Sequence, residues 1–343
     1  MRDVLKNKIL NITNSSAKKN GEGISTEKDF EDLAFQIFEY QYKYNAFYQR
    51  YCSLIGKELS KINQLSKIPF LPIQFFKNNI IKTGIWNEEF IFTSSGTTGI
   101  TTSQHFVREL DFYNQLTIHG FERFYGSITE YCVLGLLPAY LERSGSSLVT
   151  MVDDFIKRSP YRQSGFFLYN YDKLNEVLLK NKENNIPTLL IGVSFALLDF
   201  VEKYQLEFPE LIVMETGGMK GRRREMIRAE LHEEIKKGFN TQVVHSEYGM
   251  TELLSQGYSK GQGVYRATPS MKLLTRDMND PLSILPNIGR LGVINLIDLG
   301  NLDTCSFIAT DDLGRVYPDN TFEILGRLDN SDIRGCNLMM SDG

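Results

Sequence analysis

The chain is poor in the residues on which several classes of protein depend. Its 343 residues include four cysteines, four histidines and one tryptophan. The cysteines Cys52, Cys132, Cys305 and Cys336 form no C-x-x-C pair, and the histidines show no zinc-ligand spacing, which argues against a metal-cluster protein. Because a chain of this length can bury a large core without disulfides, we expect free thiols in a reducing cytoplasm.

An excess of charge of one sign and long apolar runs are also lacking. Lysine and arginine total 38 against 42 aspartates and glutamates, a net charge of −4, so the chain has no general attraction for nucleic-acid phosphates. No apolar run approaches the about 18 residues of a membrane span. Residues 1–22 are polar and lack the apolar segment of a secretory signal. We therefore expect no nucleic-acid partner, no membrane span and a cytoplasmic location.

What the chain does contain is the composition of a globular protein, with 42% hydrophobic and 23% charged residues. Residues 27–60 carry apolar, mostly aromatic side chains at helical spacing, which predicts two helices. Residues 68–77 contain Pro69 and Pro72 among large apolar side chains, which predicts an extended connector packed on the body.

From residue 131 onward, short apolar runs alternate with helical patterns, which predicts a mostly parallel sheet. The predicted strands are residues 131–137, 189–195, 211–215 and 241–245, and the predicted helices are residues 171–182 and 222–237. After Gly261 the apolar runs are separated by Gly, Asn and Asp turns, which indicates a smaller antiparallel β lobe. Its predicted strands are residues 293–299, 305–310 and 321–325.

These changes of pattern divide the chain into four parts. We expect an N-terminal helical segment and connector at residues 1–85, an α/β core at residues 86–260, a β lobe at residues 261–328 and a hinge-like tail at residues 329–343.

The densest run of hydroxyls and glycines is Phe92-Thr-Ser-Ser-Gly-Thr-Thr-Gly99. Such a segment can direct backbone N–H groups and hydroxyls at a phosphate, but it also suits a hairpin turn, and composition leaves both interpretations open. No Gly-Lys-Ser/Thr sequence closes it, so it is not a Walker A motif.

Two further segments combine groups that a nucleotide needs. His245-Ser-Glu-Tyr-Gly-Met-Thr-Glu252 follows a predicted strand and offers an aromatic ring, a glycine, a hydroxyl and a carboxylate, the last able to hold Mg²⁺. Thr310-Asp-Asp-Leu-Gly-Arg315 offers a carboxylate for ribose hydroxyls, although alone it is better explained as a hairpin.

Together and in this order, the three segments resemble the adenylate-forming superfamily of acyl-CoA synthetases, luciferases and peptide-synthetase adenylation domains. A fourth, residues 318–335, resembles the superfamily's hinge region. The resemblance implies the N-terminal domain of an adenylate-forming enzyme, an α/β fold of mostly parallel αβ sheets with a small β lobe, and the cofactors ATP and Mg²⁺. Because the printed chain ends at Gly343, the mobile C-terminal domain of most relatives, with its lysine, is expected to be absent.

The resemblance also assigns roles to individual residues. Tyr248 would lie against the adenine, Thr251 would contact the α-phosphate and Glu252 would bind Mg²⁺. Asp312 would take the ribose hydroxyls. The full set placed around ATP is Ser94, Ser95, Gly96, Thr97, Thr98, Gly99, Gly217, Gly218, Tyr248, Gly249, Asp312 and Arg327. Two departures are Asp311, where the superfamily commonly has glycine, and residues 100–103, which lack the usual Pro-Lys.

Within the superfamily, the chain is similar to the long-chain fatty acid protein ligases of bacterial luminescence, the LuxE-type acyl-protein synthetases. Residues 68–77 and 138–148 look like that family's N-terminal signature segments. The similarity implies activation of a fatty acid to acyl-AMP, transfer to Cys336 as a thioester, and acyl reductase (LuxC-type) and acyl-transferase partners. The acyl chain would lie near Tyr140, Ser194 and Phe195.

Three alternatives stay open from the sequence. One is a ligase of the phenylacetate-CoA type, with free coenzyme A as acceptor. Another is a non-catalytic nucleotide-binding or scaffold protein. The third is an α/β domain in which the motifs are ordinary loops.

Overall fold

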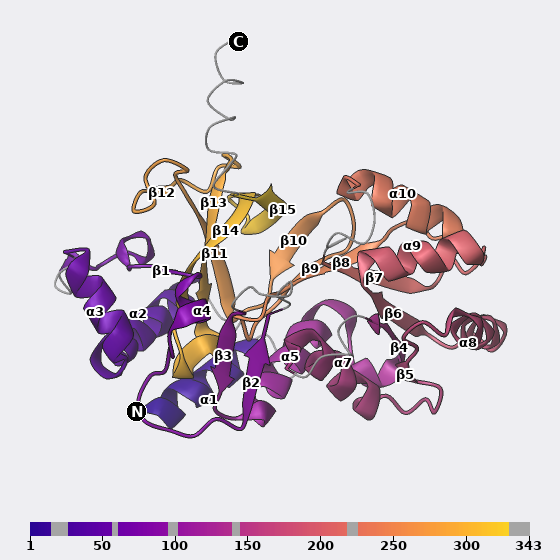
Figure 1. Cartoon of the computed structure of the whole chain (residues 1–343), viewed down its shortest axis with the longest axis horizontal. Helices are drawn as coiled ribbons and strands as arrows, with labels where there is room; N and C mark the ends of the chain where they lie inside the picture. The colour runs from indigo at the N-terminus through magenta and orange to yellow at the C-terminus, as the bar shows by residue number, and fades with distance from the viewer. Residues whose placement is uncertain (15–26, 57–60, 95–101, 139–144, 218–225, 329–343) are drawn as a thin grey trace, which may run out of the picture.

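In the computed structural model of this chain, the described residues are 1–14, 27–56, 61–94, 102–138, 145–217 and 226–328 (Figure 1). A single sheet of thirteen strands runs through the molecule, and a separate two-stranded hairpin lies beside it. No helix in these ranges is long and apolar enough to cross a membrane.

One half of the large sheet is parallel. Its strands, from the edge inward, are β5 (Gly165–Phe166), β4 (Cys132–Leu136), β6 (Thr188–Gly192), β7 (Ile212–Thr216) and β8 (His245–Tyr248). Every residue of β4 and β6 is buried, which is why their sequences are continuous apolar runs rather than alternating ones. The carboxyl ends of β6, β7 and β8 therefore meet at one edge, where α/β folds commonly bind ligands.

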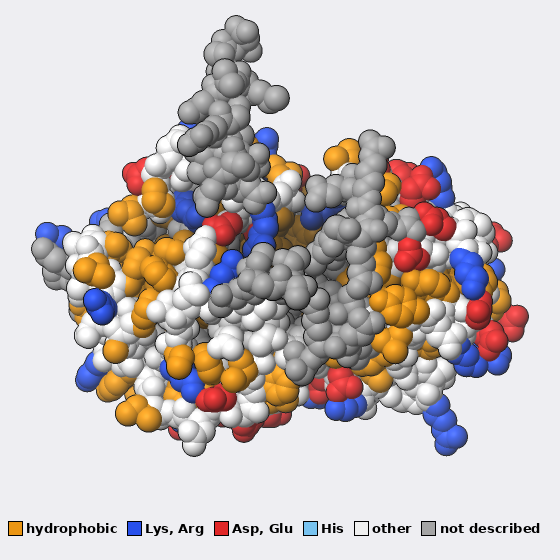
Figure 2. Space-filling view, viewed as in Figure 1, with side chains coloured by type: hydrophobic (Ala, Val, Ile, Leu, Met, Phe, Trp, Pro, Cys, Tyr) orange, Lys and Arg blue, Asp and Glu red, His pale blue; other side chains and the backbone are white. Residues whose placement is uncertain are grey.

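Helices cover this parallel half (Figure 1). On one side lie α9 (Ser194–Lys203) and α10 (Arg228–Phe239), with α8 (Tyr171–Glu183) near the end of the sheet, and on the other lie α5 (Leu110–Tyr125) and α7 (Ser147–Arg158). Gly238 of α10 lets this helix approach α9, because a Cβ there would lie 2.3 Å from the Cβ of Val201. Acidic and basic side chains are mixed on the outer surface of α8 to α10 (Figure 2), including the pairs Lys203–Asp172 and Lys237–Glu234.

The other half of the sheet is antiparallel and continues directly from β8. In order, its strands are β9 (Gly257–Ser259), β10 (Val264–Ala267), β15 (Thr321–Arg327), β14 (Phe307–Val316), β13 (Gly292–Asp298), β11 (Met271–Arg276) and β12 (Ile284–Leu285). Hydrogen bonding is thus continuous across residue 260. The division of the chain into four parts stays a prediction.

Two boundaries predicted for the parallel strands are wrong. The strand predicted to reach residue 195 ends at Gly192, and helix α9 begins at Ser194. The strand predicted at residues 241–245 begins only at His245, because the preceding residues end helix α10. Asn240 adopts the left-handed conformation there, and the Thr241 N–H donates to the Lys236 carbonyl.

The N-terminal part matches its prediction in outline. The two helices expected in residues 27–60 are α2 (Glu27–Tyr44) and α3 (Ala46–Leu54). The connector does pack on the body in extended form, since β1 (Leu71–Pro72) pairs in parallel with β14, but it ends in a helical turn, α4 (Phe75–Asn78).

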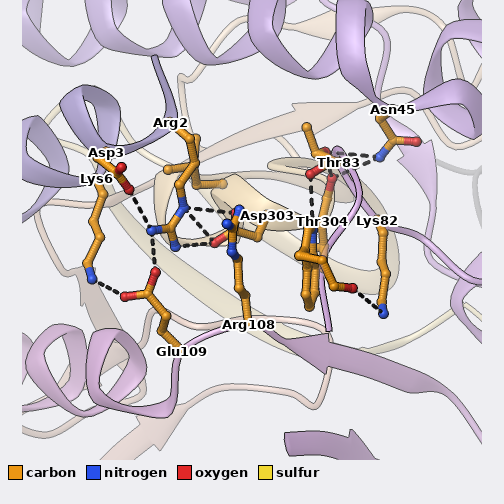
Figure 3. Close-up of polar contacts among 12 residues, drawn as sticks. Arg2, Asp3, Lys6, Asn45, Lys82, Thr83, Arg108, Glu109, Asp303 and Thr304 are labelled. Atoms are coloured by element: carbon orange, nitrogen blue, oxygen red, sulfur yellow. Dashed lines mark hydrogen bonds and ion pairs between the residues drawn. The ribbon is translucent and has the colours of Figure 1, made fainter. Parts of the chain in front are cut away.

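Helix α1 (Arg2–Thr13) was not predicted, because its sequence is largely polar. It buries Leu5 and Ile9 and is tied to the body by charge (Figure 3). The Arg2 Nη2 atom lies 2.5 Å from Oδ2 of the buried Asp303, in the 3-10 segment η5 (Leu299–Asp303), and Arg2 and Lys6 both pair with Glu109. A largely polar helix is thus held by two buried apolar side chains together with ion pairs.

Replacing Arg2 with Met is expected to destabilise the fold by about 3 kcal/mol, because Asp303 stays buried and, among the described residues, keeps only the ion pair with Arg108, at 3.4 Å. Urea unfolding measures the change. Lys173→Met is the matched control, because it breaks the exposed pair Lys173–Glu176 and should cost less than about 1 kcal/mol. Equal losses in the two variants would contradict the importance of the buried network.

Candidate active site

Three residues that are far apart in the sequence meet at the carboxyl end of β8. The Tyr248 hydroxyl donates a hydrogen bond of 2.7 Å to Asp312 Oδ2, and Arg327 Nε donates one of 3.2 Å to Asp312 Oδ1. Asp312 and Arg327 are register partners on β14 and β15, and the Tyr248 ring packs edge-on against Phe322. Burial raises the pKa of Asp312, while Tyr248 and Arg327 oppose that shift.

The segment around Asp312 is a strand interior. The hairpin favoured for residues 310–315 on composition is therefore wrong, since all six lie within β14. The register between β14 and β15 shifts at Leu313 and Gly314, and a Cβ on Gly314 would lie 2.3 Å from the Glu323 carbonyl oxygen. Gly314 thus permits an irregularity two residues after Asp312, a common device for directing side chains at a site.

The turn that follows β8 carries Thr251 and Glu252. Its backbone is fixed by buried side chains from other elements: Asn301 Nδ2 donates to the Glu252 carbonyl at 2.8 Å, and Asp298 Oδ2 accepts from the N–H groups of Leu254 and Ser255 at 2.8 and 2.9 Å. The turn is therefore a rigid part of the core.

The Glu252 side chain is only 6% exposed and has no ion pair among the residues that the structure describes. Burial raises its pKa, and a hydrogen bond from Ser103 opposes that shift. Arg327 and Asp312 also act on Glu252 electrostatically, so these three side chains share one neighbourhood. A buried carboxylate without an ion-pair partner is costly, and Glu252 offers one oxygen ligand of the kind that Mg²⁺ prefers. The described residues hold no cluster of three or more His, Cys, Asp or Glu side chains that would complete a metal site.

The hydroxyl- and glycine-rich segment connects the strands of the small hairpin, β2 (Phe90–Thr93) and β3 (Gln104–Val107). Its ends are joined, since the Ser94 N–H donates to the Ser103 carbonyl and the Ser103 N–H to Ser94 Oγ at 2.9 Å. The other residues predicted for this segment lie outside the described residues: Ser95, Gly96, Thr97, Thr98 and Gly99. The predicted site residues Tyr140, Gly218 and Cys336, from other parts of the chain, also lie outside them.

His105, on β3, connects this hairpin to the turn after β8. Its Nδ1 lies 3.0 Å from the Thr251 carbonyl oxygen, and its Nε2 lies 3.0 Å from Thr304 Oγ1. Because a carbonyl only accepts, Nδ1 carries the proton and Nε2 accepts from the hydroxyl. Burial lowers the pKa of His105 to about 4, so the ring is neutral at pH 7. Sequence reasoning missed His105, because its partner is 146 residues away.

The remaining predicted residues lie near the carboxyl ends of β6 and β7. Gly217 follows β7 with φ of +43°, a backbone conformation that favours glycine. Ser194 begins α9 and donates a 3.2 Å hydrogen bond to Glu215 Oε2, and Phe195 is buried beside it in the chain. Gly249 follows Tyr248 directly and is exposed. The roles expected for these residues stay predictions.

No family model and no curated protein matches this chain. Solved structures do. ATP-bound MatB from Rhodopseudomonas palustris is 20% identical, with a TM-score of 0.50 over 69% of this chain and 47% of its own. A 2-hydroxyisobutyryl-CoA ligase in complex with 2-HIB-AMP and CoA is 13% identical, with a TM-score of 0.61 over 92% of this chain and 74% of its own. A long-chain-fatty-acid-CoA ligase from Archaeoglobus fulgidus is 15% identical, with a TM-score of 0.51 over 73% of this chain and 53% of its own.

At these identities the likeness concerns the fold. The chain has the mixed α/β fold of adenylate-forming enzymes, as expected from its motifs, and it spans about half the length of the MatB structure (47%).

Proposed function

We propose that this protein activates a carboxylic acid with ATP. A carboxylate oxygen attacks the α-phosphorus, the bond to the β-phosphate breaks, and an acyl adenylate and pyrophosphate result. The observation that carries the proposal is the meeting of Tyr248, Asp312 and Arg327 beside the buried Glu252, on a fold shared with acid–CoA ligases.

Each residue of the group has a distinct task in this reaction. Asp312, oriented by Tyr248, would accept the ribose hydroxyls, and Thr251 and the hydroxyls around Ser94 would contact the phosphates. When bound, Mg²⁺ on Glu252 would stabilise the negative charge that builds on the phosphate oxygens. Because the turn at residues 251–252 is held rigidly by Asn301 and His105, little reorganisation is needed as that charge develops.

The finer proposal is that the acid is a long-chain fatty acid and that the acceptor is a protein thiol, Cys336, from which the acyl group passes to an acyl reductase. It is supported by the similarity of residues 68–77 and 138–148 to the acyl-protein synthetases. A CoA ligase is the second candidate, because the solved structures of similar fold include CoA ligases.

One experiment tests the proposal and separates the two acceptors. The protein is incubated with Mg·ATP and radiolabelled fatty acid, with and without coenzyme A, and pyrophosphate release is followed. Denaturing gels with and without hydroxylamine detect a protein thioester, and mass analysis detects acyl-CoA. A protein that binds ATP yet releases no pyrophosphate with any acid would be a non-catalytic nucleotide-binding protein.

Asp312→Ala is expected to weaken ATP binding by about 10- to 100-fold, because the ribose hydroxyls would lose their hydrogen bonds to the charged carboxylate. Because ribose contacts are equal in the ground and transition states, kcat should change little. The KM for ATP in pyrophosphate exchange measures this. Asp311→Ala is the control, because it removes the neighbouring carboxylate, which accepts a hydrogen bond from Gln74 and has no role in the proposed site. A collapse of kcat at unchanged KM would mean that Asp312 acts in the chemical step.

His105→Phe is expected to lower kcat by about 10-fold, because the Thr251 backbone loses a buried hydrogen bond worth on the order of 1 kcal/mol. The KM for ATP should stay within about twofold, since His105 positions Thr251 and does not touch the nucleotide in this proposal. His105→Asn, which keeps a donor, should recover part of the loss. His119→Gln, a half-buried histidine hydrogen-bonded to Thr13, should have no effect. Equal losses of kcat in His105→Phe and His119→Gln would point to a general destabilisation.

A further inference from the structure

The strand pair β7–β8 carries a buried carboxylate on each of its two faces. Glu215 is 4% exposed and Glu247 is 8% exposed. Glu215 is paired in register with Ser246, and Thr216 with Glu247. Because successive side chains of a strand point to opposite faces, Glu215 and Glu247 lie on different sides of the sheet.

The two carboxylates differ in how their charge is compensated. Glu215 Oε1 lies 3.7 Å from Arg228 Nε and 3.6 Å from His232 Nε2, and its Oε2 accepts from Ser194 Oγ. Burial alone would raise the pKa of Glu215, but a hydrogen bond from His232 and the charge of Arg228 outweigh burial and hold the pKa below its ordinary value. Glu215 is therefore fully accounted for by the fold.

Glu247 has no such compensation. Thr216 Oγ1 donates to its Oε2 at 2.7 Å, and no Lys, Arg or His of the described ranges forms an ion pair with it. Burial raises the pKa of Glu247 to about 7, and the charge of Glu215 adds to that shift. The ionised form of such a buried carboxyl would be stabilised by a hydrogen-bond donor or a cation on a bound molecule.

The Glu247 carboxyl lies against the turn that leads to Thr251. A Cβ on Gly249 would sit 2.4 Å from Glu247 Oε1 and 3.8 Å from Gln256 Cγ, so both side chains border the same glycine. Among the residues that the structure describes, the buried Gln256 Oε1 atom has no hydrogen-bond partner, and neither has the buried hydroxyl of Tyr258, the register partner of Glu247 on β9. The Gln256 amide oxygen only accepts hydrogen bonds, the Glu247 carboxylate only accepts them in its ionised form, and the Tyr258 hydroxyl can accept as well.

We propose that Glu247, together with Gln256 and Tyr258, binds a hydrogen-bond-donating group, a protonated amine or a hydroxyl, on the acyl part of the acid. This rests on the proposed function, which places the reacting carboxylate beside Thr251, two residues after Gly249. A plain hydrocarbon chain leaves these buried groups unpaired, and sites built to bind a polar group reject the analogue that lacks it. We therefore expect an acid that carries such a donor to bind more tightly than the unsubstituted fatty acid of the same length.

The test measures binding first and catalysis second. Calorimetry without ATP compares butyrate, hexanoate and decanoate with derivatives that carry an amine or a hydroxyl at carbon 2, carbon 3 or the terminal carbon. At least one derivative should bind about 10-fold or more tightly than its parent acid. Glu247→Leu should remove that preference, and the exposed control Glu210→Gln should keep it.

Glu247→Gln separates the two donors and guards against misfolding, because it keeps the shape of the side chain. It should lose the preference for an amine more than that for a hydroxyl. Parent acids that bind as tightly as every derivative, no binding by any derivative, or a preference that survives Glu247→Leu would overturn the assignment. A preference that depends on Glu247 without any pyrophosphate exchange would instead overturn the proposed function and leave the binding site standing.

Discussion

Glu252→Gln is expected to lower ATP–pyrophosphate exchange by on the order of 10²-fold or more, as when a group that stabilises transition-state charge is lost. The carboxylate is 6% exposed, lies near Asp312 and Arg327, and is the Mg²⁺ ligand in the function that we propose. Glutamine keeps the size and the acceptor oxygen of the side chain but not its charge, so the cation would lose its anionic ligand.

The fold should tolerate this change. Burial already raises the pKa of Glu252, which means that its charge is poorly compensated in the apoprotein. Removing such a charge is neutral or stabilising, so thermal melting should be unchanged or shifted upward. Titration of exchange activity with Mg²⁺ gives the specific readout, since the variant should require more metal than the wild type. Unchanged pyrophosphate release at low Mg²⁺ would remove Glu252 from the site.

The sequence predicted those parts of the fold whose signal is local. The runs that form β4 and β7 and the pattern that forms α8 lie within one or two residues of their predicted positions. The misplaced start of β8 depends on how α10 ends, with Asn240 in the left-handed conformation, which no hydrophobic pattern reveals. Helix α1 was missed for a related reason, because its sequence is largely polar and its ion-pair partners Asp303 and Glu109 lie far along the chain.

The candidate site shows the same limit. Tyr248 and Asp312 were singled out because each stands in a short motif, and the structure joins them by a hydrogen bond. His105 and Asn301 stand in no motif, and only the folded chain shows that they hold the backbone of residues 251 and 252. Glu247 stands inside a motif, yet its role depends on which face of β8 it occupies and on the lack of a nearby cation, neither of which can be read from spacing.

The cysteines carry the second large prediction, which concerns the acyl acceptor. Thioester formation needs a thiolate that can reach the adenylate: its sulfur attacks the acyl carbon, a C–S bond forms and AMP leaves with the bonding electrons. Cys52, Cys132 and Cys305 are all at most 1% exposed. Burial raises the pKa of each thiol, that of Cys52 to about 12, so they are poor nucleophiles at neutral pH.

Cys336 lies outside the described residues, and its sequence context differs from that of the other three. Its neighbours are Gly335 and Asn337, with Arg334 one residue further, whereas Cys132 lies in a buried apolar strand. A thiol near a guanidinium ionises more readily than one in an apolar core. The proposal of a protein thiol as acceptor rests on the resemblance of the motifs to acyl-protein synthetases, which implies an acyl-accepting cysteine in this region.

Cys336→Ser is therefore expected to form acyl adenylate and release pyrophosphate at the wild-type rate in single turnover, and to retain no hydroxylamine-labile acyl label on a denaturing gel. Cys52→Ala is the matched control, because it removes a thiol that is buried and protonated, and it should keep the full label. The serine hydroxyl is far less nucleophilic than a thiolate, so an oxygen ester should not replace the thioester. Persistent labelling of Cys336→Ser would move the acceptor to another cysteine, whereas a wild-type protein that labels only added coenzyme A would make the chain an acid–CoA ligase.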